Sequence, residues 1–225
     1  MVDLPVGSDD RSRLARNPLR EQIRRVLVDG LLSGRWQPGE RIVERRIAAE
    51  LNVSQAPVRE ALRELETLRL IESVPNKGAR VRAFGVADMA EIYPVRAGLE
   101  LVAAELAAPG LAEDPRPLER EVDALKRATA EGDVEEQIKH SVEFHREIVR
   151  AARNSVLLHT WESLGVEVWT RLSVRWLNME LHAKAADHAQ ITEAFRKCDP
   201  EVGRMLRDHV LNYVEAAMKS HNAVR

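Results

Sequence analysis

Residues 44–70 read ERRIAAELNVSQAPVREALRELETLRL, a stretch that predicts two short helices meeting at a tight corner. In the first helix Ile47 and Leu51 share an apolar face. Asn52 follows, a residue type that tolerates the left-handed backbone conformation a corner needs. Ser54 then has the position of a helix N-cap. The stretch therefore predicts a helix-turn-helix.

The second helix carries amide and guanidinium groups at every fourth position on its polar face, at Gln55, Arg59 and Arg63. Arginine can bond a guanine edge through two N–H groups, and glutamine an adenine edge. The N-terminal residues of the second helix point at the bases in such motifs. We therefore expect Gln55 and Arg59 to read bases. The alternative is a solvated helix face with ordinary charges.

Residues 71–82 form two short β-prone runs around an Asn-Lys-Gly turn, which predicts a hairpin wing. Lys77 at its tip can meet phosphate, and Gly78 allows close backbone approach to a groove. Together ERRIAAELNVSQAPVREALRELETLRLIESVPNKGARV resembles the winged helix-turn-helix of the GntR superfamily of bacterial transcription regulators. The resemblance implies DNA binding, although family members typically carry arginine at position 55. The family's DNA-contact positions hold Arg45, Ser54, Ala56, Arg59 and Gly78.

Composition is that of a globular protein, with 44% hydrophobic and 31% charged residues in 225. The one cysteine, Cys198, excludes an internal disulfide framework and fits a reducing cytoplasm. No apolar stretch reaches the length of a membrane span, so we expect a cytoplasmic protein. Residues 16–82 hold 14 Lys and Arg against 9 Asp and Glu, a net +5, whereas residues 83–225 hold 18 against 24, a net −6. This division indicates a basic DNA-binding head on an acidic body.

Four parts follow from these patterns: a disordered tail over 1–15, the winged domain over 16–82, a linker over 83–86 and a helical domain over 87–222. Overall the fold is predicted to be mainly α, with a small β-wing and a C-terminal all-α six-helix bundle. The bundle helices are expected at about 87–108, 115–131, 133–152, 154–180, 183–197 and 199–221.

The helical half resembles the FadR-type ligand-binding domain, known as the FCD domain. The resemblance is carried by IYPVRAGLELVAAELAA, EFHREIVRAARNSVLL, DHAQITEAF and MLRDHV. It implies that this half binds a small effector and forms a homodimer, whose two heads would read the half-sites of a palindromic operator. Repression is the expected direction of control, by analogy with such regulators.

Three histidines lie on apolar stripes of different predicted helices: His145, His188 and His209. One inward histidine is more often a core residue than a ligand, but three that converge inside a bundle could bind zinc, nickel or iron. The family resemblance assigns these positions to metal ligands, with an aspartate four residues before the first as the fourth. That position is Ser141 here.

Losing this carboxylate leaves two hypotheses open. Either a transition metal, with zinc preferred, remains and a small carboxylate effector completes its coordination shell, or the histidines bond an organic ligand directly.

Arg96 shares a helix face with apolar residues, so its charge requires a buried partner. It could form an internal salt bridge, for instance with Glu100, or hold an effector carboxylate as family members do. Arg175 is a second candidate of the same type.

Two function classes are consistent with these residues. One is a ligand-responsive, DNA-binding transcription regulator. The other is a metal-dependent hydrolase-like enzyme, since three histidines with an open position could activate water. The basic winged domain and the lack of an identifiable general acid or base favour the regulator, so we expect no catalytic residues.

Overall fold

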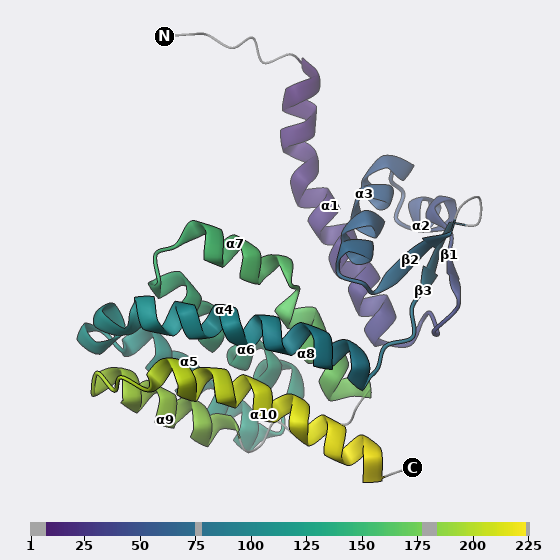
Figure 1. The fold of residues 1–225 in the computed structure, drawn as a ribbon. Coiled ribbons are helices and arrows are strands. Elements are labelled where there is room, and N and C mark those ends of the chain that lie inside the picture. Colours follow the sequence, from purple (N-terminus) through teal and green to yellow (C-terminus); the bar gives the residue numbers. More distant parts are fainter. Residues whose placement is uncertain (1–7, 75–77, 177–183, 224–225) are drawn as a thin grey trace. The chain divides into compact units, whose positions relative to one another are not determined.

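The computed structural model describes residues 8–74, 78–176 and 184–223, and the chain divides into two compact units, Met1–Phe84 and Gly85–Arg225. Figure 1 shows helices in both units and a small sheet in the first. The predicted fold class is therefore confirmed. None of the described helices combines the length and the apolarity that crossing a membrane requires.

The N-terminal unit is a winged helix-turn-helix. Its elements in order are α1 Ser8–Leu32, β1 Arg41–Ile42, α2 Glu44–Glu50, α3 Gln55–Thr67, β2 Ile71–Val74 and β3 Gly78–Val81. The antiparallel sheet has the order β1-β3-β2, so the predicted hairpin is present and a short third strand extends it. The turn of the wing, including Lys77, lies outside the described residues.

The core of this unit forms where α1 packs against α3. Leu27 of α1 and Val58 and Leu65 of α3 are fully buried, and Ile71 of the sheet is nearly so. Burying such side chains stabilises the unit by about 1.5–3 kcal/mol each. This packing leaves the polar face of α3 exposed to solvent.

Helix α1 begins at Ser8, inside the segment that was predicted to be a tail. From Ser8 onward the structure therefore has a helix where the sequence predicted a tail.

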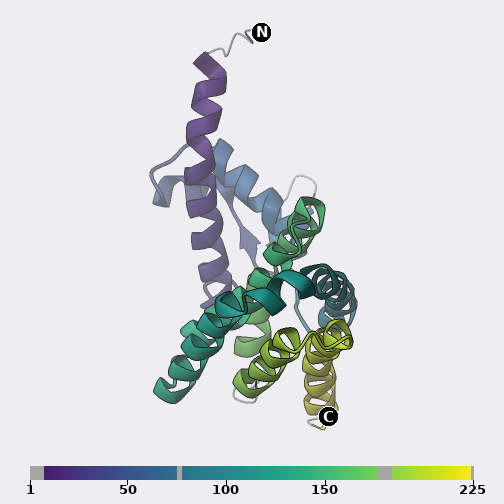
Figure 2. The ribbon, with the colours of Figure 1, turned by 90° about the vertical axis from the view of Figure 1, so that its left-hand side faces the viewer.

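The C-terminal unit is all helical. Its helices are α4 Val86–Glu113, α5 Arg116–Glu131, α6 Val134–Ala151, α7 Ser155–Ser163, α8 Val166–Trp176, α9 Lys184–Arg196 and α10 Val202–Ala223. The helix pair α4 and α10 packs together, and α9 lies beside α10 in both views (Figures 1 and 2). Side-chain caps define the starts of α6 and α7: the Asp133 carboxylate accepts from the Glu136 N–H at 3.1 Å, and the Asn154 side chain accepts from the Leu157 N–H at 3.1 Å.

Two predicted helix ends differ from the structure. Residues 154–180 do not form one helix, because Gly165 adopts a left-handed conformation (φ 66°) between α7 and α8. The described part of this unit therefore has seven helices rather than six. Helix α4 also continues past Pro109 to Glu113, since Pro109 is exposed and water can replace the hydrogen bond that its ring removes.

Candidate DNA-binding face and candidate metal centre

The corner between α2 and α3 has the predicted backbone geometry. Asn52 is left-handed (φ 52°), and the Val53 N–H donates to the Ala48 carbonyl at 2.9 Å. Ser54 occupies the N-cap position of α3 with an extended backbone, but its hydroxyl makes no capping hydrogen bond. The predicted N-cap position of Ser54 is therefore confirmed, without a side-chain capping bond. Ser54 is exposed, so water can satisfy the first N–H groups of α3.

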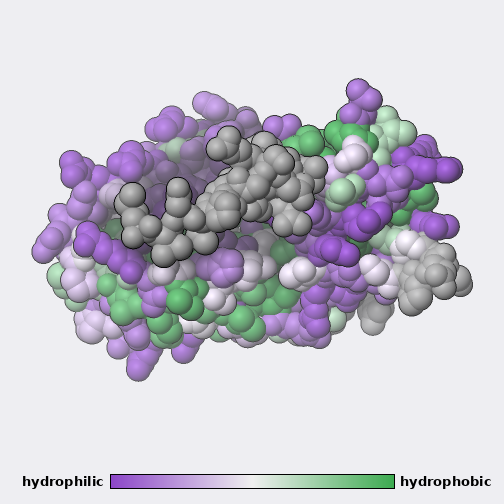
Figure 3. All heavy atoms as spheres, turned by 90° about the horizontal axis from the view of Figure 1, so that it is seen from above, coloured by the Kyte–Doolittle hydropathy of each residue, from purple (hydrophilic) through white to green (hydrophobic). Residues whose placement is uncertain are grey.

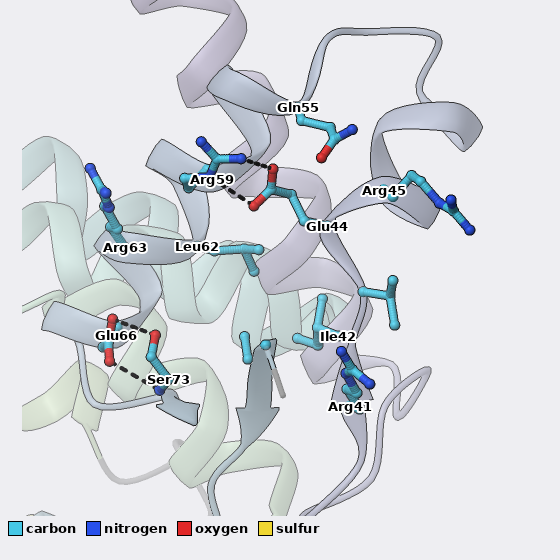
Figure 4. Close-up of a pocket in the computed structure, with 13 residues that line it drawn as sticks. Arg41, Ile42, Glu44, Arg45, Gln55, Arg59, Leu62, Arg63, Glu66 and Ser73 are labelled. Carbon is cyan, nitrogen blue, oxygen red and sulfur yellow. Dashed lines mark hydrogen bonds and ion pairs between the residues drawn. The ribbon is translucent and has the colours of Figure 1, made fainter. Parts of the chain in front are cut away.

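The polar stripe of α3, formed by Gln55, Arg59 and Arg63, is exposed and borders a concave pocket of about 480 Å³ (Figure 4). Arg45 at the start of α2 and Gly78 at the start of β3 line the same pocket. The fold therefore gathers five of the predicted DNA contacts around one surface. Ser54 and Ala56 are exposed in the same region of the chain without lining the pocket.

Arg59 is held by Glu44, a residue that the sequence analysis did not single out. Its Nε and Nη2 atoms donate to the two carboxylate oxygens of Glu44 at 3.0 and 2.7 Å (Figure 4). These hydrogen bonds raise the pKa of Arg59, which stays charged. The pair occupies one edge of the guanidinium and leaves its outer edge available. No local spacing could reveal this contact, because the partners lie 15 residues apart on different helices.

The other carboxylate beside the stripe also has a partner. Both oxygens of Glu66 accept from Ser73 of β2, one from its N–H at 3.0 Å and one from its hydroxyl at 2.9 Å. Arg41, Arg45 and Arg63 add positive charge to the same pocket. A polyanion would therefore meet an electropositive surface here.

The three predicted inward histidines converge. His145 of α6, His188 of α9 and His209 of α10 are at most 8% exposed, so their inward orientation is confirmed. A ligand atom from each lies within 4.8 Å of the others, and the ring centroids are 4.7–5.4 Å apart. Imidazole nitrogens in this arrangement fit one transition-metal ion such as zinc. Their role as ligands stays a prediction.

Glu100 of α4 is fully buried beside this cluster and accepts three hydrogen bonds. Its Oε1 atom accepts from Arg96 Nε at 2.7 Å and from Trp161 Nε1 at 2.8 Å, while Oε2 lies 2.6 Å from His145 Nδ1. Burial alone would raise the pKa of Glu100, but the charge of Arg96 and the contact with His145 hold it at about 2. The internal salt bridge of Arg96, one of the two predicted roles, is thus present.

Arg96 nevertheless borders a small cavity next to the histidines. The cavity is also lined by Ser141, His145, His209 and Tyr213, among others, and its volume is about 10 Å³. This is roughly the room for a single water. An arginine, a hydroxyl and imidazoles around one cavity suit an anionic ligand. The side chain of Arg175 lies outside the described part of the structure.

Both units match known families. Residues 19–81 match bacterial regulatory proteins of the gntR family, and residues 91–212 match the FCD domain. Over 213 residues the chain is 37% identical to the "Probable D-xylose utilization operon transcriptional repressor" of Paenarthrobacter nicotinovorans, a match that covers 94% of each protein.

Solved structures share the fold. Escherichia coli McbR/YncC has a TM-score of 0.66 at 23% identity, over 92% of this chain and 99% of that chain. The metal-free FCD domain of TM0439 has a TM-score of 0.52 at 19% identity, over 63% of this chain and 99% of that chain.

Proposed function

This chain belongs to the gntR family of bacterial regulatory proteins and carries an FCD domain, and from this premise we propose a specific mode of action. The protein is a transcriptional repressor with a DNA-binding unit and a ligand-binding unit. In our proposal it binds a palindromic operator as a homodimer. A small carboxylate, bound beside a three-histidine metal centre, controls that binding.

In the proposed DNA complex, Gln55 and Arg59 enter the major groove. Support comes from their exposure at the N-terminal half of α3 and from the Glu44 pair, which leaves the outer edge of the Arg59 guanidinium unoccupied by Glu44. That edge has N–H groups that can donate two hydrogen bonds to the O6 and N7 atoms of a guanine. Arg45 and Arg63 would contact phosphates and add affinity for any sequence.

In the helical unit, His145, His188 and His209 would hold the metal. Zinc is the first candidate and nickel or iron are alternatives, because imidazole suits these ions. The bound ion would attract an anionic effector as a Lewis acid. Ser141 provides no carboxylate, so an effector carboxylate has less competition at the ion, and Arg96 would pair with its second oxygen.

The cavity is too small for an organic acid, since its 10 Å³ admits about one water. Effector binding would therefore require a second packing of the helices around it. A ligand that binds this second packing better than the first would shift the population toward it. Because α4 begins at Val86, directly after the winged unit, a change in its packing could alter DNA affinity. The name of the relative, which refers to D-xylose utilization, makes sugar-derived acids a sensible first ligand series.

Homodimerisation is proposed to use the exposed apolar side of α4. Val95, Val102 and Leu106 are 43–53% exposed, and their spacing of seven and four residues places them on one helix face. Apolar residues also stand out in green among hydrophilic ones on the face drawn in Figure 3. Such a row favours contact with a second helix of the same kind.

The observation that carries this proposal is the convergence of three buried histidines in a chain whose other unit has an exposed Gln-Arg stripe. The test is to incubate the purified protein with fragments of its own genome, with and without a chelator, and to sequence the retained DNA. We expect a short palindrome near genes of catabolism or transport. Retention of no specific DNA in either condition, with candidate sugar acids present and absent, would contradict operator binding.

A further inference from the structure

Glu100 has a role that the salt bridge with Arg96 does not explain. Its two carboxylate oxygens face different groups: Oε1 accepts from Arg96 and Trp161, whereas Oε2 faces only the Nδ1 atom of His145 among the described contacts. At 2.6 Å the contact with His145 is short, and both residues are buried to at least 98%. Its partners thus come from α4, α6 and α7, and the carboxylate has a fixed position.

The chemistry of this contact determines which ring nitrogen carries hydrogen. An ionised carboxylate only accepts hydrogen bonds, so the Nδ1 atom of His145 must be the donor. In a neutral imidazole with hydrogen on Nδ1, the lone pair is on Nε2, and a metal ion requires that lone pair. The contact therefore selects Nε2 as the atom that can coordinate.

We propose that Glu100 is a positioning residue that holds His145 in the Nδ1–H form and keeps Nε2 as the ligand atom. The inference rests on the proposed metal centre and assigns it a carboxylate outside the three histidines and outside position 141. Ser141 provides no negative charge to the proposed metal centre. The carboxylate of Glu100 on α4 would partly replace that charge, acting on the ion through its hydrogen bond to His145. A similar but longer contact joins His209 Nδ1 to Asp187 at 3.5 Å.

The substitution Glu100→Gln tests this role with almost no change in shape. Two N–H donors face the Oε1 side, so the amide oxygen of glutamine should occupy that side. Its NH₂ group would then face His145 and donate to Nδ1. The imidazole would have to carry its hydrogen on Nε2, the nitrogen that should bind metal. Glu105→Gln is the matched control, since Glu105 is on the same helix and exposed.

The first readout is the histidine ring in metal-free protein at pH 8, observed by long-range ¹H–¹⁵N correlation. We expect His145 to be the Nδ1–H form in the unsubstituted protein and in Glu105→Gln, and the Nε2–H form in Glu100→Gln. The inference is overturned by an Nε2–H ring in the unsubstituted protein or by an unchanged form in a folded Glu100→Gln variant. The spectrum of the unsubstituted protein decides the form even when the variant does not fold.

The second readout is the zinc dissociation constant, measured by competition with a chelating dye. Glu100→Gln should weaken zinc binding by about 10–100-fold, as expected for loss of a partner that orients a ligand, while Glu105→Gln should not. Equal zinc affinity in all three proteins would contradict the positioning role. Absence of zinc binding to the unsubstituted protein would instead refute the metal part of the proposed function, and the ring spectra would still decide the form of His145.

Discussion

Arg59 combines an exposed position with a defined orientation. Its side chain is 53% exposed, yet Glu44 fixes the direction of the guanidinium through two hydrogen bonds. Solvent screens such a pair, so it contributes little to stability. In the proposed DNA complex its value would be in recognition, because less side-chain freedom is lost when an oriented arginine meets a base.

At the residue scale we predict that Arg59→Ala weakens operator binding by about 1–3 kcal/mol and relaxes the preference at one base position. The reason is the loss of a paired contact to a base edge. Binding to operators with single substitutions, measured by fluorescence anisotropy at fixed salt, checks this. Lys77→Ala should lower the affinity for operator and random DNA alike, through loss of a phosphate contact. Equal losses on both DNAs for Arg59→Ala would show that it reads no base.

Two glycines with different backbone conformations show how helices are bounded in this chain. Gly165 is left-handed and separates α7 from α8, whereas Gly110 lies within α4 and would meet no atom within 4 Å if it carried a Cβ. One glycine is required by its conformation. The other only loses conformational entropy on folding.

At the element scale we predict opposite effects for the same change at these sites. Gly165→Ala should lower the free energy of unfolding by about 1–2 kcal/mol, because a Cβ is strained at positive φ. Gly110→Ala should raise it by about 0.4–1 kcal/mol by restricting the unfolded chain. Urea unfolding at one protein concentration measures both. A stabilising Gly165→Ala would mean that α7 and α8 can join as one helix.

At the scale of the whole molecule, the two units carry different polar groups. The winged unit presents arginines at its surface, and the helical unit encloses three histidines and the Arg96–Glu100 pair. The proposed homodimer would connect these tasks. Once one head is bound to its half-site, the second head is held near the other half-site at a high effective concentration, so the dimer binds the palindrome more tightly than one head does. The apolar row on α4 is the part of the helical unit that we propose to mediate it.

We predict that Leu106→Asp shifts the protein from dimer to monomer, since a carboxylate would have to be buried in the apolar contact. Sedimentation over a range of protein concentrations measures the shift, and operator affinity should fall with it. Val156→Asp is the control, because Val156 is 74% exposed and belongs to α7 rather than to the helix that carries the row. Identical sedimentation of the two variants would contradict an interface on α4.

Metal removal should affect the units differently. With zinc at about 100 times its dissociation constant, the helical unit should be stabilised by about 2.7 kcal/mol, and a chelator should remove this gain. Amide hydrogen exchange, followed in peptides from each unit, measures the protection of the two units separately. His159→Ala, at an exposed histidine on α7, should keep the zinc response, whereas His188→Ala should lose it. Equal protection of the winged unit in all conditions is expected.

The sequence by itself determined the corner at Asn52, the wing, the face of α3 and the inward direction of three histidines. These features follow from local rules: a residue type that tolerates positive φ, and periodicities of two and 3.6 residues. Helix ends were less accessible. Gly165 and Pro109 are both helix-breaking types, yet only Gly165 ends a helix, because exposure and backbone conformation decide the effect.

Only the tertiary structure decided which side chains far apart in the sequence are partners. Glu44 reaches Arg59 across 15 residues, and Glu100 reaches His145 across 45 and Trp161 across 61. A hydrogen bond between two elements requires their donor and acceptor atoms to be placed to within a few tenths of an ångström, and periodicity along one helix carries no such information. The local pattern therefore identified the histidines, while the fold decided that a buried carboxylate meets one of them.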